Sequence, residues 1–131
     1  MQIRILTGDE IRQALPMNKA IEAMRSAFGQ FSAGQANVPL RSRLAGEKGV
    51  MLLMPAFMKT SKDLAVKLVS VYEDNPGLGL PTVSALVLVF DPQTGRPKAL
   101  MEGDVLTGLR TGAAGGLAAM RSSAVSSASY G

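Results

Sequence analysis

The sequence predicts an α+β fold, in which N-terminal helices are followed by a mainly antiparallel sheet and a long helix, with no Rossmann domain. Three observations lead to this prediction. Apolar residues recur at spacings of three and four near the start of the chain, short apolar runs separated by turn residues fill the middle, and a long Gly- and Ala-rich segment follows. Because the strands come in one run and do not alternate with helices, a parallel βαβ sheet is excluded.

The N-terminal part predicts a short strand and two helices. Ile3–Leu6 is the strand, and Thr7 with Glu10 three residues later fits a capping box that starts the first helix. Pro16 suits the first turn of the second helix. The residues expected on its buried face are Met17, Ala20, Ile21, Met24, Ala27, Phe28 and Phe31.

Five apolar segments predict the strands of the sheet. They are Val38–Leu44, Val50–Phe57, Leu64–Tyr72, Thr82–Asp91 and Arg96–Met101. The second is almost continuously apolar and is expected to be covered on both faces. The last helix is expected from about Asp104 to Met120, and the Ser-rich residues 121–131 read as a disordered tail.

The composition bounds the classes of function. A chain of 131 residues fits one domain, and the absence of Cys and His excludes disulfides, thiolate and imidazole chemistry and most zinc sites. The net charge of +4 comes from scattered bases and not from a block, so nucleic acid is not a predicted partner. The apolar runs are too short for a membrane helix, and the N-terminus does not resemble a signal peptide, so a cytoplasmic protein is expected.

Lys67 is the first candidate for chemistry. Strand alternation places it on one face with Ala65 and Val69, where a lysine is costly to bury unless it has a partner. Two interpretations stay open. It is either an edge-strand lysine that discourages aggregation, or an ammonium group held in a cleft where it binds a carboxylate.

Other cations fit the second interpretation. Arg110 lies among Gly and Ala residues of the last helix, where it either points to solvent or forms a fork for a carboxylate. Arg41 and Arg43 share one strand face, which is either solvated or part of a substrate clamp. Thr82 begins a strand, and Asp104 supplies a negative charge at the N-terminus of a helix. These residues predict a cationic cleft for a small carboxylate without naming a reaction.

Several motifs in a fixed order carry a resemblance. They are VPLRSRL, VMLLMPAF, VKLVSVYEDNPGLGLPTV, LVLVFDPQTGRPKALMEGDVLT and LRTGAAGGLAA. With these motifs the chain resembles, over about residues 1–120, the N-terminal half of the ornithine cyclodeaminase/mu-crystallin family, which includes alanine dehydrogenases and ketimine or pyrroline-2-carboxylate reductases. Each motif alone is weak, but the combination is specific.

The resemblance implies an NAD(P)-dependent hydride transfer at the α-carbon of a small amino, imino or keto acid, without a metal. A lysine and two arginines hold the substrate carboxylate in this family. By motif these are Lys67, which is also the catalytic candidate, Arg110 and Arg41, with Arg43 as the neighbouring alternative to Arg41. Thr82 matches a position that contacts the nicotinamide dinucleotide. The unit formed by residues 80–119 would bring Thr82 and Arg110 to the site opposite Lys67.

Family members continue into a Rossmann domain that binds NAD or NADP and supplies a catalytic acid, whereas this chain ends at Gly131. The resemblance therefore implies that residues 1–120 are a substrate-binding and dimerisation domain and that 121–131 mark a truncation. Such a fragment is expected to be inactive alone and to bind no cofactor tightly. Its expected partners are a small carboxylate and a second copy in a homodimer. The alternative function is a non-enzymatic, carboxylate-binding domain of mu-crystallin type.

Overall fold

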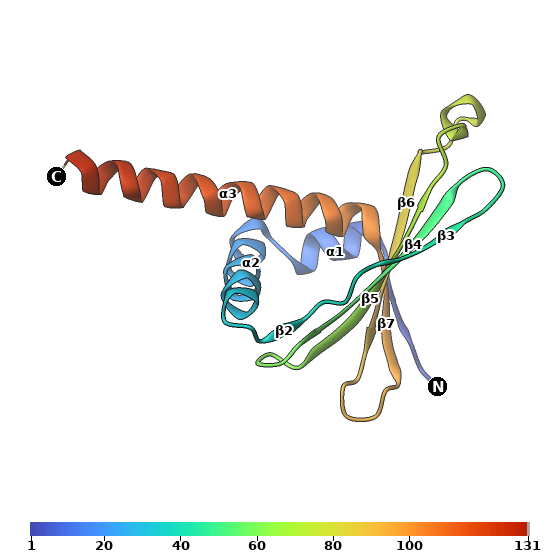
Figure 1. Ribbon diagram of the computed structural model, residues 1–131, viewed down its shortest axis with the longest axis horizontal. Coiled ribbons are helices and arrows are strands. Elements are labelled where there is room, and N and C mark those ends of the chain that lie inside the picture. The colour runs from blue at the N-terminus through green and yellow to red at the C-terminus, as the bar shows by residue number, and fades with distance from the viewer. Residues whose placement is uncertain (131) are drawn as a thin grey trace.

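The computed structural model describes the backbone of residues 1–130 and the side chains of residues 1–120. Its elements are β1 (Arg4–Leu6), α1 (Gly8–Ala14), α2 (Met17–Ser32), β2 (Ala36–Asn37), β3 (Ser42–Ala45), β4 (Val50–Met58), β5 (Asp63–Val71), the 3₁₀ helix η1 (Asn75–Leu78), β6 (Val83–Phe90), β7 (Pro97–Glu102) and α3 (Gly103–Tyr130). The α-helices lie together on one side of a single sheet (Figure 1). The predicted α+β class is confirmed.

The sheet is mainly antiparallel, as expected. Its strand order is β1-β7-β6-β5-β4-β2, and β3 also pairs with β4. The pair β1–β7 runs parallel, and the other pairs run antiparallel. The four long strands lie within one residue of their predicted ends. The predicted strand Val38–Leu44 is wrong in its first half, because pairing with β4 begins only at Ser42.

The turn into α1 confirms the predicted capping box. The Glu10 backbone N–H donates to Thr7 Oγ1 at 3.3 Å, and the Thr7 hydroxyl donates to Glu10 Oε1 at 3.2 Å. Pro16 differs from its prediction, because it is the N-cap of α2 and not part of its first turn. Its ψ of 158° is extended, so the helix begins only at Met17.

The apolar face of α2 is less buried than its spacing predicts. Ala20 is buried, but Phe28 is 37% exposed and Phe31 is 64% exposed. The physical reason is that α2 packs mainly on α3 and makes no comparable contact with a strand. One neighbouring helix covers one edge of the apolar face and leaves the phenylalanines over an open space.

The junction between β7 and α3 fastens the helix to the sheet. The Glu102 carboxylate accepts hydrogen bonds from the backbone N–H groups of Asp104 at 2.7 Å and Val105 at 2.9 Å. Asp104 lies in the first turn, as predicted. A Cβ placed on Gly103 would lie 2.7 Å from the backbone of Ala85, so only glycine lets the helix start this close to β6.

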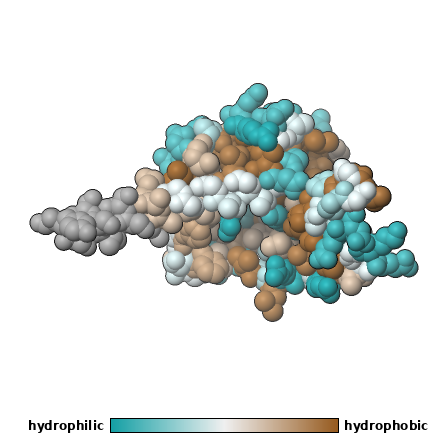
Figure 2. Space-filling view, turned by 90° about the horizontal axis from the view of Figure 1, so that it is seen from above, coloured by the Kyte–Doolittle hydropathy of each residue, from teal (hydrophilic) through white to brown (hydrophobic). Residues whose placement is uncertain are grey.

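The helix α3 ends later than composition predicts. It runs to Tyr130, past the expected end at Met120 and through most of the segment expected to be a disordered tail. The side chains of residues 121–131 lie outside the described residues, and the division of the chain at residue 120 stays a prediction. Seen from above in Figure 2, α3 forms a pale band of weakly polar residues with apolar groups along both sides.

The core is small and lies between α3, the shorter helices and the middle of the sheet. Its buried apolar residues are Ile11, Ala20, Val69, Ala85, Ala113 and Leu117. The expectation that β4 is covered on both faces is wrong for this chain, because Met51 is 43% exposed and no residue of that strand is buried. No helix in the described part of the chain is long and apolar enough to cross a membrane.

Candidate functional site

Lys67 lies at the centre of the face of the sheet that the helices cover. In the strand register it pairs with Met54 of β4 on one side and with Val87 of β6 on the other. Directly paired residues project to the same face, so the ammonium group rises from an apolar row toward α3. The edge-strand interpretation of this lysine is wrong, since β5 lies between β4 and β6.

Thr107 of α3 is the hydrogen-bond partner of this lysine. The Lys67 ammonium group donates through Nζ to Thr107 Oγ1 at 2.7 Å, in a partly buried contact. Thr107 and Arg110 are three residues apart and therefore lie on the same face of α3. Together with Lys67 they line a cavity of about 350 Å³. The structure thus brings Lys67 and Arg110 together, as predicted.

Arg41 approaches the same region from the segment before β3. It lines a second cavity, of about 400 Å³, whose wall also includes Lys67 and Met54. The register gives the reason: β3 starts to pair with β4 at Ser42, so Arg41, one residue earlier, comes level with Met54, the direct partner of Lys67. Arg43 lines neither cavity. The geometry favours Arg41 over Arg43 as the neighbour of Lys67.

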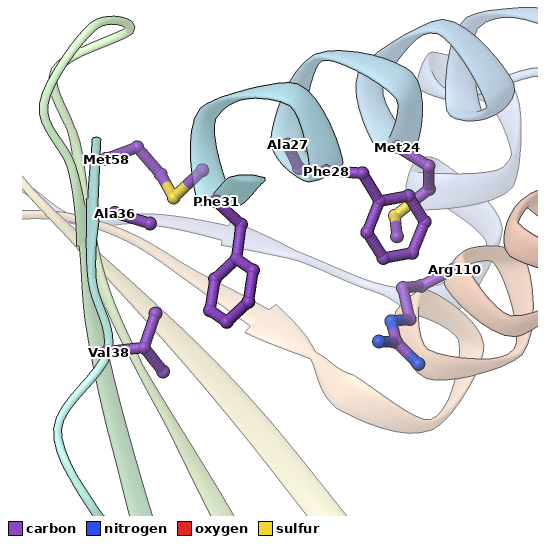
Figure 3. Close-up of a pocket in the computed structure, with 8 residues that line it drawn as sticks. All are labelled: Met24, Ala27, Phe28, Phe31, Ala36, Val38, Met58 and Arg110. Atoms are coloured by element: carbon purple, nitrogen blue, oxygen red, sulfur yellow. The ribbon is translucent and has the colours of Figure 1, made fainter. Parts of the chain in front are cut away.

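A third cavity, of about 440 Å³, adjoins the other two. It shares Arg110 with the cavity around Thr107 and shares Val38 with the cavity around Arg41. Figure 3 shows the rings of Phe28 and Phe31, the Val38 side chain and the Arg110 guanidinium directed toward this space. The three cavities share lining residues, and we refer to them together as the depression between α2, α3 and the sheet.

The cations around this depression have no carboxylate partner within residues 1–120. The ion pair found in that range joins Arg12 and Asp9 at 2.9 Å on the exposed surface of α1. Over the same range, no three metal-ligating side chains lie close enough together to hold a metal ion. Uncompensated cations at a concave surface attract small anions, and a guanidinium beside an ammonium suits a carboxylate.

Thr82 is the predicted site residue that lies far from Lys67 in the structure. It precedes β6, and its carbonyl oxygen accepts a hydrogen bond from the Tyr72 backbone N–H at 2.8 Å. Val87, the partner of Lys67, is five residues farther along the strand, roughly 16 Å at the usual rise per residue. The expectation that Thr82 lies opposite Lys67 is therefore wrong, and its contact with a dinucleotide stays a prediction.

Two residues that line the cavities around Lys67 are not predicted by the sequence motifs. Thr107 is not among the predicted site residues, although its spacing from Arg110 in LTGLRT places the two on one helix face. Met54 carries no signal of its own in an apolar run, and only the register with Lys67 reveals its place. Both omissions follow from contacts between segments that are distant in the sequence.

The chain thus combines a sheet with one helix-covered face and a cluster of cations that have no carboxylate partner within residues 1–120. The comparison with known families then identifies the group to which it belongs. The chain is a member of the ornithine cyclodeaminase/mu-crystallin family, whose model matches residues 1–129. The resemblance seen in the motifs is confirmed.

Curated relatives and solved structures agree with this membership. An alanine dehydrogenase from Archaeoglobus fulgidus is 41% identical over 119 residues, which cover 91% of this chain and 36% of the relative. The mouse ketimine reductase mu-crystallin is 32% identical, over 84% of this chain and 36% of its own length. The chain therefore spans about a third of the length of the relatives that it matches.

Among solved structures, the Thermococcus litoralis Δ1-pyrroline-2-carboxylate reductase in complex with NADH and L-proline is 42% identical and superimposes with a TM-score of 0.80, over 87% of this chain and 36% of that one. An archaeal alanine dehydrogenase dimer with bound NAD is 40% identical and also has a TM-score of 0.80, over 88% of this chain and 36% of that one. The fold described above is thus the fold of one part of these NAD(H)-bound enzymes.

Proposed function

We propose that this chain is the substrate-binding and dimerising part of an NAD(P)-dependent oxidoreductase that acts on a small amino, imino or keto acid. The observation that carries the proposal is the convergence of Lys67, Arg110 and Arg41 on adjoining cavities without a carboxylate partner in residues 1–120. The names of the relatives, an alanine dehydrogenase and a pyrroline-2-carboxylate reductase, support this class of substrate.

Each cation has a role in the proposal. Arg110 offers the planar fork that suits a carboxylate, and Arg41 adds a second guanidinium from the sheet edge. Lys67, oriented by the hydroxyl of Thr107, adds a point charge and is the proposed catalytic residue. A cationic site disfavours a protonated amine beside it, which helps to generate the free amine or imine from which hydride transfer proceeds.

The nicotinamide dinucleotide would supply the hydride chemistry, but the described residues do not form a site for it by themselves. A dinucleotide fold needs a Gly-rich turn between a parallel strand and a helix. Within residues 1–130 the parallel pairing is that of β1 with β7, and the Thr7-Gly8 turn that follows β1 lacks the GxGxxG pattern. Thr82 is therefore the one contact with the dinucleotide that is proposed for this part of the protein.

A reconstitution experiment tests the proposal. Mixing this chain with the separately produced cofactor-binding half of a pyrroline-2-carboxylate reductase is expected to restore NAD(P)H consumption with pyrroline-2-carboxylate as substrate. The same mixture with the Lys67→Met chain is the control and is expected to stay inactive. Failure of turnover while the chain alone still binds pyruvate in calorimetry would favour the non-enzymatic, mu-crystallin-like function. If the mixture shows no turnover and the chain alone does not bind pyruvate, both the enzymatic and the non-enzymatic function are refuted.

We also propose that the chain forms a homodimer through the sheet face opposite the helices. Leu44, Met51 and Leu86 project from that face and are 64%, 43% and 44% exposed, and one solved relative is a dimer. Light scattering is expected to give twice the mass of one chain, and Leu86→Glu to give a monomer. The same change at Leu78, 75% exposed in η1, is expected to leave the dimer intact. A monomeric wild-type chain at high concentration would contradict this proposal.

A cytoplasmic location of the chain stays a prediction.

A further inference from the structure

The cavity between α2 and the sheet contains an unusual set of apolar side chains. Phe28, Phe31 and Val38 line it and are 37%, 64% and 54% exposed, and the side chains of Met24 and Met58 complete its walls. Large apolar groups left in contact with water at a concave surface are a site for an apolar ligand group. The charged residue on this wall is Arg110.

Arg110 also lines the cavity that contains Lys67 and Thr107, so it stands on the border of two compartments. On one side lie the ammonium and hydroxyl groups joined by a 2.7 Å hydrogen bond. On the other side lie the two phenylalanine rings (Figure 3). A ligand whose carboxylate is held at Arg110 would therefore direct the rest of its structure either along the sheet or into the apolar compartment.

The volume of the apolar cavity indicates the size of the ligand group that it can accept. The apolar cavity is about 440 Å³, nearly three times the roughly 150 Å³ of an engineered apolar cavity that holds benzene. It has room for a phenyl ring with its methylene linker. An acid as small as pyruvate or alanine has no group long enough to leave the neighbourhood of Arg110 and fill this space.

We infer that the apolar cavity is the subsite for the side chain of the acid, and that the chain prefers α-keto or α-amino acids with an apolar group of phenyl size over those with a methyl group. This inference rests on the proposed function, because Arg110 must hold the carboxylate. It deepens that function by naming the substrate class. The occupant is the ligand's own side chain, since the same guanidinium that binds the carboxylate forms part of the cavity wall.

Calorimetry on the whole chain tests the inference with two acids, phenylpyruvate and pyruvate. Burying a phenyl group is expected to make phenylpyruvate bind at least about tenfold more tightly than pyruvate. Phe31→Ala is expected to reduce this preference at least about threefold while leaving the affinity for pyruvate unchanged. Because Phe31 is 64% exposed, its truncation is not expected to unfold the chain. Val38→Ser provides a second variant from the opposite wall, with the same expected loss of preference.

The control is Leu78→Ala, which removes an exposed apolar side chain, 75% exposed, from η1, away from the proposed dimer face and from the lining of these cavities. It is expected to change neither affinity. Equal binding of the two acids to the wild-type chain would overturn the inference and leave the proposed function standing. An equal loss for both acids in Phe31→Ala would also overturn it, because the residue would then act through the fold. Binding of neither acid would refute the proposed function itself.

Discussion

Replacing Lys67 by methionine is expected to weaken the binding of pyruvate by roughly ten- to a hundredfold, as measured by calorimetry. A hydrogen bond to a charged group contributes about 1.5–3 kcal/mol, and every 1.4 kcal/mol corresponds to about a factor of ten in affinity. Methionine is close to lysine in length, and the strand neighbours Met54 and Val87 are apolar, so the fold is expected to persist. Circular dichroism checks that it does.

The matched control for this variant is Lys98→Met. Lys98 is also a strand lysine, in β7, but it is exposed and alternates with Ala99, which pairs with Val89 on the helix-covered face. Both variants lower the net charge from +4 by one unit. If the two weakened pyruvate binding equally, the attraction would come from the overall charge of the chain and not from a site at Lys67.

Gly103→Ala is expected to destabilise the chain by about 2–3 kcal/mol, the upper part of the range of about 1–3 kcal/mol that is usual when extra atoms are forced into a packed core. The added Cβ would lie 2.7 Å from the carbonyl carbon, carbonyl oxygen and Cβ of Ala85. Because two of these are backbone atoms of β6 in the interior of the sheet, they cannot move away cheaply. The expected fall in the thermal midpoint is roughly 10 °C, measured by a circular dichroism melt.

Gly108→Ala is the control on the same helix, and it is expected to have the opposite sign. Nothing lies within 4 Å of a Cβ at Gly108, so alanine meets open space there. In a helix interior, replacing glycine by alanine is worth about 0.5–1 kcal/mol of stability. A similar loss of stability in both variants would mean that helix propensity, and not the contact with Ala85, governs the result at Gly103.

Local signals in the sequence were sufficient where the relevant contacts are themselves local. The capping box at Thr7, the ends of the long strands and the charge of Asp104 in the first turn of α3 depend on residues a few positions apart. They failed where a neighbour distant in the sequence decides the outcome. The exposed rings of Phe28 and Phe31 have a helical spacing typical of a core, but α2 packs mainly on α3 and leaves them uncovered.

For the candidate site too, some features could be predicted from the sequence and others only from the tertiary structure. The motifs alone were enough to name the family and to single out Lys67, Arg110 and Arg41, with Arg43 as the alternative to Arg41, as candidate carboxylate ligands. They could not distinguish an edge lysine from a central one, because alternation along β5 is the same in both cases. Pairing with both β4 and β6 excludes the edge, and the crossing of α3 provides the Thr107 hydroxyl as partner.

By itself, then, the amino-acid sequence determined the class of fold, the family and the kinds of residue that can hold a carboxylate, since all of these depend on local periodicity and on motifs. The tertiary structure alone decided which residues meet. In the fold, Arg41 and not Arg43 lines a cavity together with Lys67, and Thr82 lies apart from both. An apolar cavity lies next to Arg110. The physical reason is that strand register and helix packing bring together segments that are far apart in the sequence. The distance between two residues in space cannot be read from their separation along the chain.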